Sequence, residues 1–222
     1  MRARIGAARR NPHEVSIVAV TKGFGVDECR EALAAGLNML GENRVHEALA
    51  KMDEVPAGLA QGALQPIQWH LIGHLQTNKV RLAAGRFALI QSVDSLRLAE
   101  GIAQLTSDQK VLVEVNVARE TQRSGVYPTD ALALIDQVAG MLDLQGLMAM
   151  GPSHGDPKAA FDELRRLRDE AEQRLGKTLP VLSMGMSGDF EVALAAGSTM
   201  LRLGQALFGP RLTPGARIAP PG

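Results

Sequence analysis

The sequence predicts a single (β/α)8 barrel, and three observations support this fold class. Short apolar runs rich in Val, Ile and Leu alternate with helix-like segments eight times along the 222 residues. Continuous apolar runs are typical of strands that are buried on both faces of a parallel sheet. Glycine or polar residues follow most of these runs, at the end of the strands where a barrel carries its reactive groups. An open doubly wound sheet is the alternative that the same alternation allows.

The strands are expected at the apolar runs, which cover residues 15–20, 37–43, 67–73, 87–93, 110–117, 144–150, 180–186 and 199–204. Helices follow each run, and a polar residue is expected to cap several of them: Asp27, Asp94, Thr129 and Asp156. The clearest helix carries apolar side chains at every third or fourth position, which predicts one face packed on a sheet: Phe161, Leu164, Leu167, Ala171 and Leu175. Residues 56–66 are rich in Gly, Pro and Ala and are expected to form a flexible connection.

Composition excludes several classes of protein. Lys plus Arg and Asp plus Glu both number 24, so no basic excess points to nucleic acid and no polybasic run to a membrane surface. No apolar run reaches the length of a membrane span. The single cysteine, Cys29, fits a reducing cytoplasm and is expected in the core. We expect one barrel domain over residues 1–211, a disordered tail over 212–222, and a monomer.

Lys22 is the first candidate for chemistry. It follows the apolar run Val15–Val20 and precedes two glycines, so a rigid strand holds it at the mouth of the sheet. A poorly solvated lysine there would lose its proton more readily and become a nucleophile toward carbonyl groups. A solvated lysine in a loop is the alternative that this stretch allows.

The loops after the last two strands are candidates for phosphate binding. Barrels often bind phosphate there through backbone N–H groups and the start of a short helix. Ser187 offers a hydroxyl, Gly188 and Gly204 permit close backbone approach, and Gln205 begins the short helix. A reactive lysine beside a phosphate site suggests pyridoxal phosphate, although phosphosugar aldolases use the same pair.

The histidines do not suggest a metal site. His70 and His74 are separated by the end of a strand and Gly73, and no cysteine or paired carboxylate completes a ligand set. His46 is expected at the surface, and Trp69 is expected to be a packing residue.

Motifs spread over the chain resemble the YggS/PROSC family of pyridoxal phosphate homeostasis proteins. The resemblance covers about Val15 to Arg211 and rests on these segments: 19–22 (AVTK), 41–43 (GEN), 69–73 (WHLIG), 75–79 (LQTNK), 123–125 (RSG), 146–150 (GLMAM), 183–189 (SMGMSGD), 197–204 (GSTMLRLG) and 208–209 (FG). The family resembles the barrel domain of alanine racemase standing alone, a fold-type III arrangement without the C-terminal β-domain.

The resemblance implies pyridoxal 5'-phosphate as the cofactor and Lys22 as its aldimine-forming residue. It implies phosphate contacts from Ser187, Gly204 and Gln205, and it places Arg202 against the pyridine nitrogen. Because arginine cannot accept a proton, that nitrogen would stay unprotonated and be a poorer electron sink. Asn43 and Met186 fall at positions that line the pocket.

The sequence departs from the family pattern at several places. Only about fourteen residues precede Val15, where most members carry a long helix. Arg123 stands where lysine is frequent, Gly188 where aspartate is frequent, and Gln205 where a shorter side chain is frequent. Backbone contacts to phosphate remain available despite the last two changes.

The resemblance implies a cytoplasmic protein that binds pyridoxal phosphate covalently and reversibly. Its expected function is to buffer this cofactor or to deliver it to apo-enzymes that depend on it, with effects on amino-acid and keto-acid balance. No robust catalytic turnover is expected. The alternative is an amino-acid racemase, which needs a second acid/base that a tyrosine of a C-terminal domain supplies, whereas this chain has only Tyr127. A Schiff-base aldolase is less favoured, because barrel aldolases usually carry their lysine later in the barrel.

Overall fold

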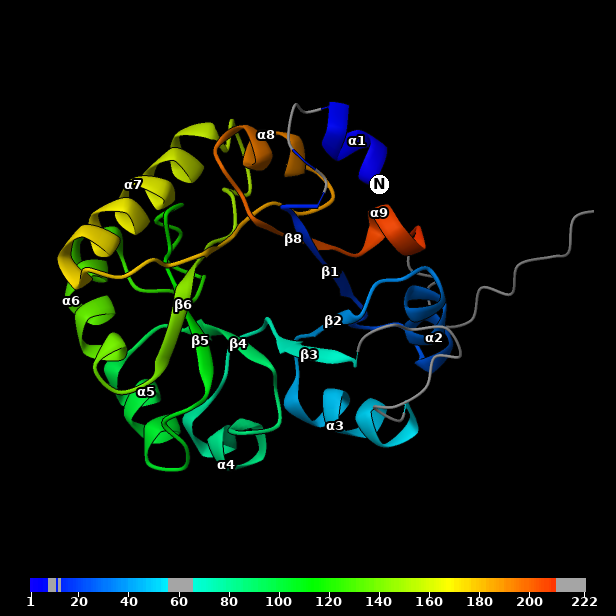
Figure 1. The fold of residues 1–222 in the computed structure, drawn as a ribbon, viewed down its shortest axis with the longest axis horizontal. Helices are drawn as coiled ribbons and strands as arrows, with labels where there is room; N and C mark the ends of the chain where they lie inside the picture. Colours follow the sequence, from blue (N-terminus) through cyan, green and yellow to red (C-terminus); the bar gives the residue numbers. More distant parts are fainter. Residues whose placement is uncertain (8–10, 12, 56–65, 211–222) are drawn as a thin grey trace, which may run out of the picture.

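The strands close into a parallel barrel in chain order, as the sequence predicted (Figure 1). The computed structural model describes residues 1–7, 11, 13–55 and 66–210. The strands are β1 (Ser16–Val20), β2 (Met39–Glu42), β3 (Gln68–Leu71), β4 (Leu89–Val93), β5 (Lys110–Glu114), β6 (Asp143–Met148), β7 (Val181–Ser183) and β8 (Met200–Leu203). The open sheet is therefore wrong for this chain, because β1 and β8 pair along four residues.

Helices surround the barrel in a ring (Figure 1). In the described chain they are α1 (Arg2–Ala7), α2 (Val26–Ala34), α3 (Val45–Glu54), α4 (Val80–Ala83), α5 (Leu96–Ala103), α6 (Pro128–Ala139), α7 (Lys158–Leu175), α8 (Phe190–Ala195) and α9 (Gln205–Phe208), with a 3-10 turn, η1, at Thr77–Lys79. The expected connection over 56–66 and tail over 212–222 fall almost wholly on residues outside the described ranges.

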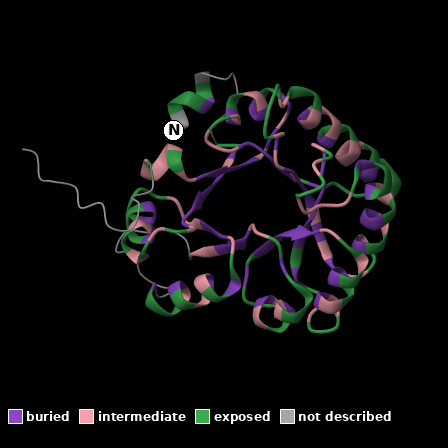
Figure 2. Ribbon diagram, turned by 180° about the vertical axis from the view of Figure 1, so that it is seen from behind, coloured by how far each residue is buried: buried purple, intermediate pink, exposed green. Residues whose placement is uncertain are grey.

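The core has two layers, as expected of a barrel. Inside the barrel, Val18, Leu89, Leu112, Met148 and Met200 form one buried apolar cluster. Outside it, aliphatic side chains fill the space between strands and helices, so that the strands are purple in Figure 2 and the helices are green only on their outer sides. Cys29 and Trp69 are both buried in the outer layer, which confirms the packing role predicted for each.

All four of the expected helix caps are wrong by one or two residues. Helices α2, α5 and α6 begin earlier or later than predicted, and the residues that precede them are Gly25, Ser95 and Tyr127. The polar side chains have other partners, because Asp27 pairs with Arg30 at 3.0 Å and Asp94 pairs with His74 at 3.1 Å. Helix α7 is preceded by Pro157, and Asp156, one residue earlier, accepts a hydrogen bond from the Lys158 amide.

The short N-terminal helix packs on the outside of the barrel. Ile5 of α1 is fully buried against Phe190 and Leu194 of α8, and Arg4 lies 4.5 Å over the Phe190 ring and pairs with Glu191. Both ribbon views place α1 at the outer rim beside α8 (Figures 1 and 2). Helix α1 therefore extends the outer core and does not lie across an end of the barrel.

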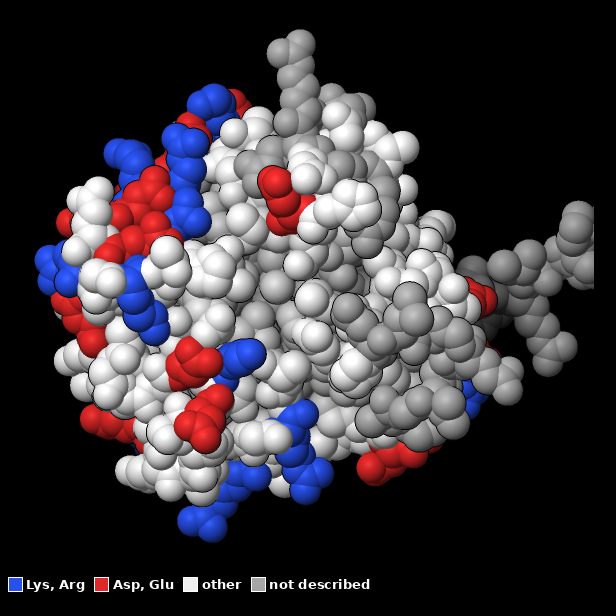
Figure 3. Space-filling model, viewed as in Figure 1, with Lys and Arg blue, Asp and Glu red and all other residues white. Residues whose placement is uncertain are grey.

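Charged side chains of both signs are mixed at the surface. On the face shown in Figure 3, Lys and Arg alternate with Asp and Glu over the outer helices, and no patch of a single sign forms. Within the described residues, no helix combines the length and the hydropathy that crossing a membrane requires.

Candidate cofactor-binding site

A cavity of about 520 Å³ opens at the carboxyl ends of the barrel strands. Residues that end or follow β1, β2, β3, β5, β6, β7 and β8 line it. All of the site residues predicted from the sequence lie along its wall: Lys22, Asn43, Met186, Ser187, Arg202, Gly204 and Gln205. The fold therefore brings these seven residues together, while their contacts with a cofactor stay a prediction.

Lys22 is held in place through its two neighbours in the chain. The carbonyl of Thr21 accepts a hydrogen bond from Lys51 Nζ at 2.8 Å, and the amide of Gly23 donates to Glu47 Oε1 at 2.9 Å. Both partners come from α3, which packs against the outside of the same part of the barrel. The half-buried Lys22 thus projects from a backbone that is fixed on both sides.

Lys51 is the centre of a buried charged cluster that sequence reasoning missed. Its ammonium lies 2.6 Å from Glu42 Oε1 and 3.1 Å from Glu47 Oε1, and Thr21 Oγ1 also donates to Glu42 Oε1 at 2.6 Å. Burial lowers the pKa of Lys51, but the two carboxylates outweigh burial and raise that pKa above its usual value. Lys51 therefore stays charged, and Lys22 is the lysine that lines the cavity. Nothing in the sequence signalled that Lys51 would be buried, because lysines in helices are mostly exposed.

The loops after β7 and β8 form a set of hydrogen-bond donors suited to phosphate. The amides of Ser187, Gly188 and Gly204 make no hydrogen bond within the described part of the chain. Ser187 Oγ accepts a hydrogen bond from the Ala206 amide at 3.1 Å, which orients the hydroxyl and leaves its proton to donate. A Cβ at Gly188 would meet nothing within 4 Å, so the backbone is open to a ligand there. This donor set fits the phosphate of the expected cofactor.

Arg202 crosses the barrel interior and reaches the same cavity. Its Nη1 donates to Ser183 O and Ser183 Oγ, both at 2.8 Å, and its Nη2 donates to Ala149 O at 2.9 Å. Burial lowers the pKa of Arg202 to about 10, against the opposing charges of Glu114 and Asp189. The guanidinium is therefore a charged, rigid donor at pH 7, as its expected place opposite a ring nitrogen requires.

Asn43 owes its position to a glycine in the loop that follows the next strand. A Cβ on Gly73 would lie 2.4 Å from the Asn43 carbonyl oxygen, so only glycine lets the loops after β2 and β3 touch. Met186 is fixed in a similar way, because its amide donates to Asp189 Oδ1 at 2.6 Å. Both side chains reach the cavity from loops whose backbones are constrained.

Glu114 is a lining residue that the sequence analysis did not identify. Its side chain is 2% exposed, Oε1 accepts a hydrogen bond from Ser124 Oγ at 3.1 Å, and Oε2 has no partner in the described chain. Burial raises the pKa of this carboxyl to about 7, although Ser124 and Arg202 act against that rise. The sequence did carry a signal for Glu114, because it is an acidic residue inside the apolar run 110–117. Burial of a lone carboxylate is costly, so an acidic residue in a buried strand indicates a special role.

The fifth strand was expected over residues 110–117, and the structure shortens it at its C-terminal end. The strand ends at Glu114, and Asn116 Nδ2 instead donates to Glu120 O at 2.8 Å in the loop that follows.

His74 lines the cavity mouth, His46 is exposed as predicted, and Tyr127 is 42% exposed and outside the lining. Among the described residues, no group of three His, Cys, Asp or Glu side chains could hold a metal ion.

The raised pKa of Glu114 predicts a change in stability with pH. The folded-state pKa of about 7 exceeds the ordinary value of 4.5, so the folded chain holds its proton more tightly than the unfolded chain. The stabilising protonated form is complete below about pH 4.5 and is lost as the pH rises through about 7. We expect Glu114→Gln to gain about 2–3 kcal/mol of unfolding free energy relative to wild type between these limits.

Urea unfolding of both chains at several pH values measures this difference. Glu31→Gln, on the exposed side of α2, is the matched control and should follow wild type at every pH. Parallel curves for wild type and Glu114→Gln would show that Glu114 is not held protonated in the folded state.

Comparisons with known proteins agree with this geometry. The family model described as "Alanine racemase, N-terminal domain" matches residues 1–212. The curated protein "Pyridoxal phosphate homeostasis protein" of Pseudomonas aeruginosa is 40% identical over 215 residues, covering 92% of this chain and 88% of its own. The protein of the same name from Aquifex aeolicus is 37% identical over 213 residues, covering 92% and 90%.

Solved structures show the same relation. PipY of Synechococcus elongatus, solved with PLP bound, is 35% identical with a TM-score of 0.78, and the match covers 94% of this chain and 100% of PipY. An alanine racemase of Clostridium difficile, at 14% identity and a TM-score of 0.74, shares the fold over 93% of this chain and 55% of its own. This chain thus matches only the barrel part of the racemase, whereas it matches nearly the full length of the homeostasis proteins. The chain belongs to the YggS/PROSC family of pyridoxal phosphate homeostasis proteins.

Proposed function

We propose that this protein binds pyridoxal 5'-phosphate covalently and reversibly through Lys22 and takes part in cofactor homeostasis. One observation carries the proposal: a single cavity presents Lys22 together with the unpaired amides and the hydroxyl of the Ser187 and Gly204 loops. An amine and a phosphate cradle are the two features that hold this cofactor at both ends. The relative PipY, whose solved structure contains PLP, supports the same assignment.

Each residue of the cavity has a distinct role in this proposal. Lys22 supplies the amine that bonds to the cofactor aldehyde, and its fixed neighbours Thr21 and Gly23 limit how far it can move. Ser187 and the amides beside it bind the phosphate. Arg202 donates toward the ring nitrogen, and its three backbone and hydroxyl contacts keep it from turning away. When bound, the cofactor supplies an electrophilic carbon and an electron-withdrawing ring.

The racemase alternative is less supported. Exchange of the proton at Cα needs acid/base groups on both faces of the bound amino acid, and such help is worth about 10²–10⁴ in rate. Tyr127, the tyrosine considered for this role, does not line the cavity. Besides Lys22 and Arg202, the titratable residues that line the cavity are Glu114 and His74. Of these two, Glu114 is buried. The curated relatives carry the name of a homeostasis protein and not of a racemase.

The finer features of this function are further proposals. We infer a cytoplasmic, monomeric carrier that passes the cofactor to apo-enzymes that depend on it. The name of the curated relatives, "Pyridoxal phosphate homeostasis protein", supports the carrier role. Size measurement in solution, and transfer to an apo-enzyme across a dialysis membrane or in direct mixture, test the last two features.

The first prediction is that Lys22 carries the cofactor. After incubation with pyridoxal phosphate and reduction with borohydride, peptide mapping should place the pyridoxyl group on Lys22. Lys22→Ala should lose the absorption band of the lysine-bound cofactor and remain folded, because its side chain is only half-buried. Lys79→Ala is the control and should keep the band, whereas a pyridoxyl group found on Lys79 would overturn the assignment.

The second prediction concerns the phosphate. Ser187→Ala removes one hydrogen bond to a charged group, which costs about 1.5–3 kcal/mol. Cofactor affinity measured by equilibrium dialysis should therefore fall by about 10- to 150-fold. Ser107→Ala, in the exposed turn before β5, should bind as wild type does. Equal affinity in Ser187→Ala and wild type would remove Ser187 from the phosphate site.

The third prediction is that the loaded protein does not turn over amino acids. Incubation with L-alanine in D₂O, followed by NMR at Cα and chiral chromatography, should give no racemised product beyond one exchange per protein. Product that accumulates over many turnovers would restore the racemase. Glu114→Gln, in the same assay, would then tell whether the buried carboxyl is the acid/base that the alternative requires.

A further inference from the structure

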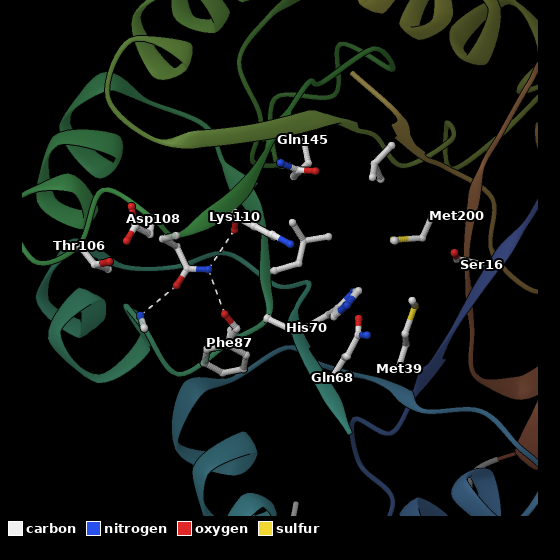
Figure 4. Close-up of a pocket in the computed structure, with 15 residues that line it drawn as sticks. Ser16, Met39, Gln68, His70, Phe87, Thr106, Asp108, Lys110, Gln145 and Met200 are labelled. Carbon is white, nitrogen blue, oxygen red and sulfur yellow. Dashed lines mark hydrogen bonds between the residues drawn. The ribbon is translucent and has the colours of Figure 1, made fainter. Parts of the chain in front are cut away.

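A second cavity lies at the opposite end of the barrel from the cofactor site. Its volume is about 690 Å³, and its lining includes the first residue of β1, β2, β3, β4, β5, β7 and β8. It therefore occupies the amino-terminal end of the strands, where nothing in the proposed function requires a cavity. Figure 4 shows its side chains converging from opposite walls, with His70 between the amide of Gln68 and the thioether of Met200.

We propose that this cavity is a second ligand site, which binds a small monocarboxylate with an apolar body through His70 and Lys110. Volumes of this size are typical of small-molecule sites. The proposal does not depend on pyridoxal phosphate, because none of the residues that line this cavity also lines the cofactor cavity.

His70 is the best-defined donor in the cavity, since a chain of buried hydrogen bonds fixes its proton. Arg202 can only donate, so Ser183 Oγ accepts from it at 2.8 Å and donates its own proton to Gln91 Oε1 at 2.7 Å. The Gln91 amide nitrogen, oriented by that contact, donates to His70 Nδ1 at 3.0 Å. Nδ1 is therefore an acceptor, and Nε2 carries the proton.

The His70 ring is 2% exposed, and no described residue accepts a hydrogen bond from its Nε2–H. Burial lowers the pKa of His70 to about 4, so the ring is neutral at pH 7 and the tautomer is the one that the chain of hydrogen bonds dictates. His70 Nε2 is not among the fully buried side-chain atoms that lack a partner in the described chain, so its N–H has access to the cavity and can donate to a ligand or water there.

The remaining lining selects the charge and shape of that ligand. Figure 4 shows the Lys110 side chain directed toward the middle of the cavity and Asp108, the acidic lining residue, at its outer edge. Gln109 is already engaged, because its amide nitrogen donates to the carbonyls of Phe87 and Lys110, both at 3.0 Å. The charged group directed into the cavity is thus the Lys110 ammonium, which favours an anion.

The opposite wall is apolar. Met39, Leu89, Val181 and Met200 line the cavity around the His70 ring. Thioether side chains adapt to ligands of different outline, so this wall suits a short aliphatic or a single aromatic body. A carboxylate between His70 and Lys110, with its carbon body on the methionines, satisfies both the donors and the apolar surface. Inorganic phosphate would satisfy only the donors.

The test uses the full chain labelled with ¹⁵N-histidine, whose long-range NMR spectrum reports the protonation of each ring nitrogen. The His70 signals, assigned by their loss in His70→Gln, should show a proton on Nε2. Titration with butyrate and with benzoate should move the Nε2–H signal to saturation. Butanol, which has the body without the charge, and inorganic phosphate, which has charge without the body, should each bind about tenfold more weakly or not at all.

Lys110→Met should weaken butyrate binding about tenfold and should fold normally, because Lys110 is exposed to solvent at the cavity. Lys177→Met, an exposed lysine in the loop before β7 and outside the lining, is the matched control and should bind as wild type does. A proton on Nδ1, no saturable shift at His70, equal binding of butanol or phosphate, or unchanged affinity in Lys110→Met would each overturn the proposal. The absorption test of Lys22 is unaffected by any of these results.

Discussion

The pairing of β1 with β8 is the constraint on which the rest of the structure depends. Ser16, Ile17, Val18 and Ala19 run alongside Met200, Leu201, Arg202 and Leu203, and this contact joins the two ends of an eight-strand sheet. Because the pairing is parallel and in register, Lys22 emerges beside the loop that begins at Gly204. An amine and a phosphate cradle from opposite ends of the sequence thus share one cavity, and no edge strand is left exposed.

Buried polar groups give this barrel a defined interior at an energetic cost. Removing one partner of such a group leaves another without a hydrogen bond, which costs about 1–3 kcal/mol. Hydrogen bonds link Arg202, Ser183, Gln91 and His70 in a single directed chain, and beside Lys22 both Lys51 and Thr21 donate to Glu42 Oε1. Glu42 Oε2, Ser92 Oγ and Glu114 Oε2 depart from this pattern in the described chain, and of these residues Glu114 lines the cavity in which a ligand is expected.

The directed chain of hydrogen bonds links the two ends of the barrel physically. Arg202 lines the cavity at the carboxyl ends of the strands, and His70 lines the cavity at their amino ends. The barrel interior between them is otherwise a small apolar cluster that contains Leu112 and Met148. In most barrels the reactive end carries the function and the other end carries stability. Here the hydrogen-bonded polar groups continue through the core. The amino-terminal end of the barrel therefore also presents a hydrogen-bond donor, His70, to a cavity.

The sequence by itself determined a parallel sheet covered by helices, because eight apolar runs of strand length are typical of strands buried on both faces. It favoured a barrel, and the pairing of β1 with β8 in the structure excluded the open doubly wound sheet that the same alternation allows. It also determined the loop residues Lys22, Ser187 and Gly204, since a residue that follows a strand has only one end of the barrel to occupy. Helix caps such as Asp27 and Asp94 were misplaced, because a distant or neighbouring charge competes with the backbone for the same carboxylate. Only the tertiary structure decided the burial of Lys51, Glu114 and His70, since burial and partners come from strands and helices that are far apart in the chain.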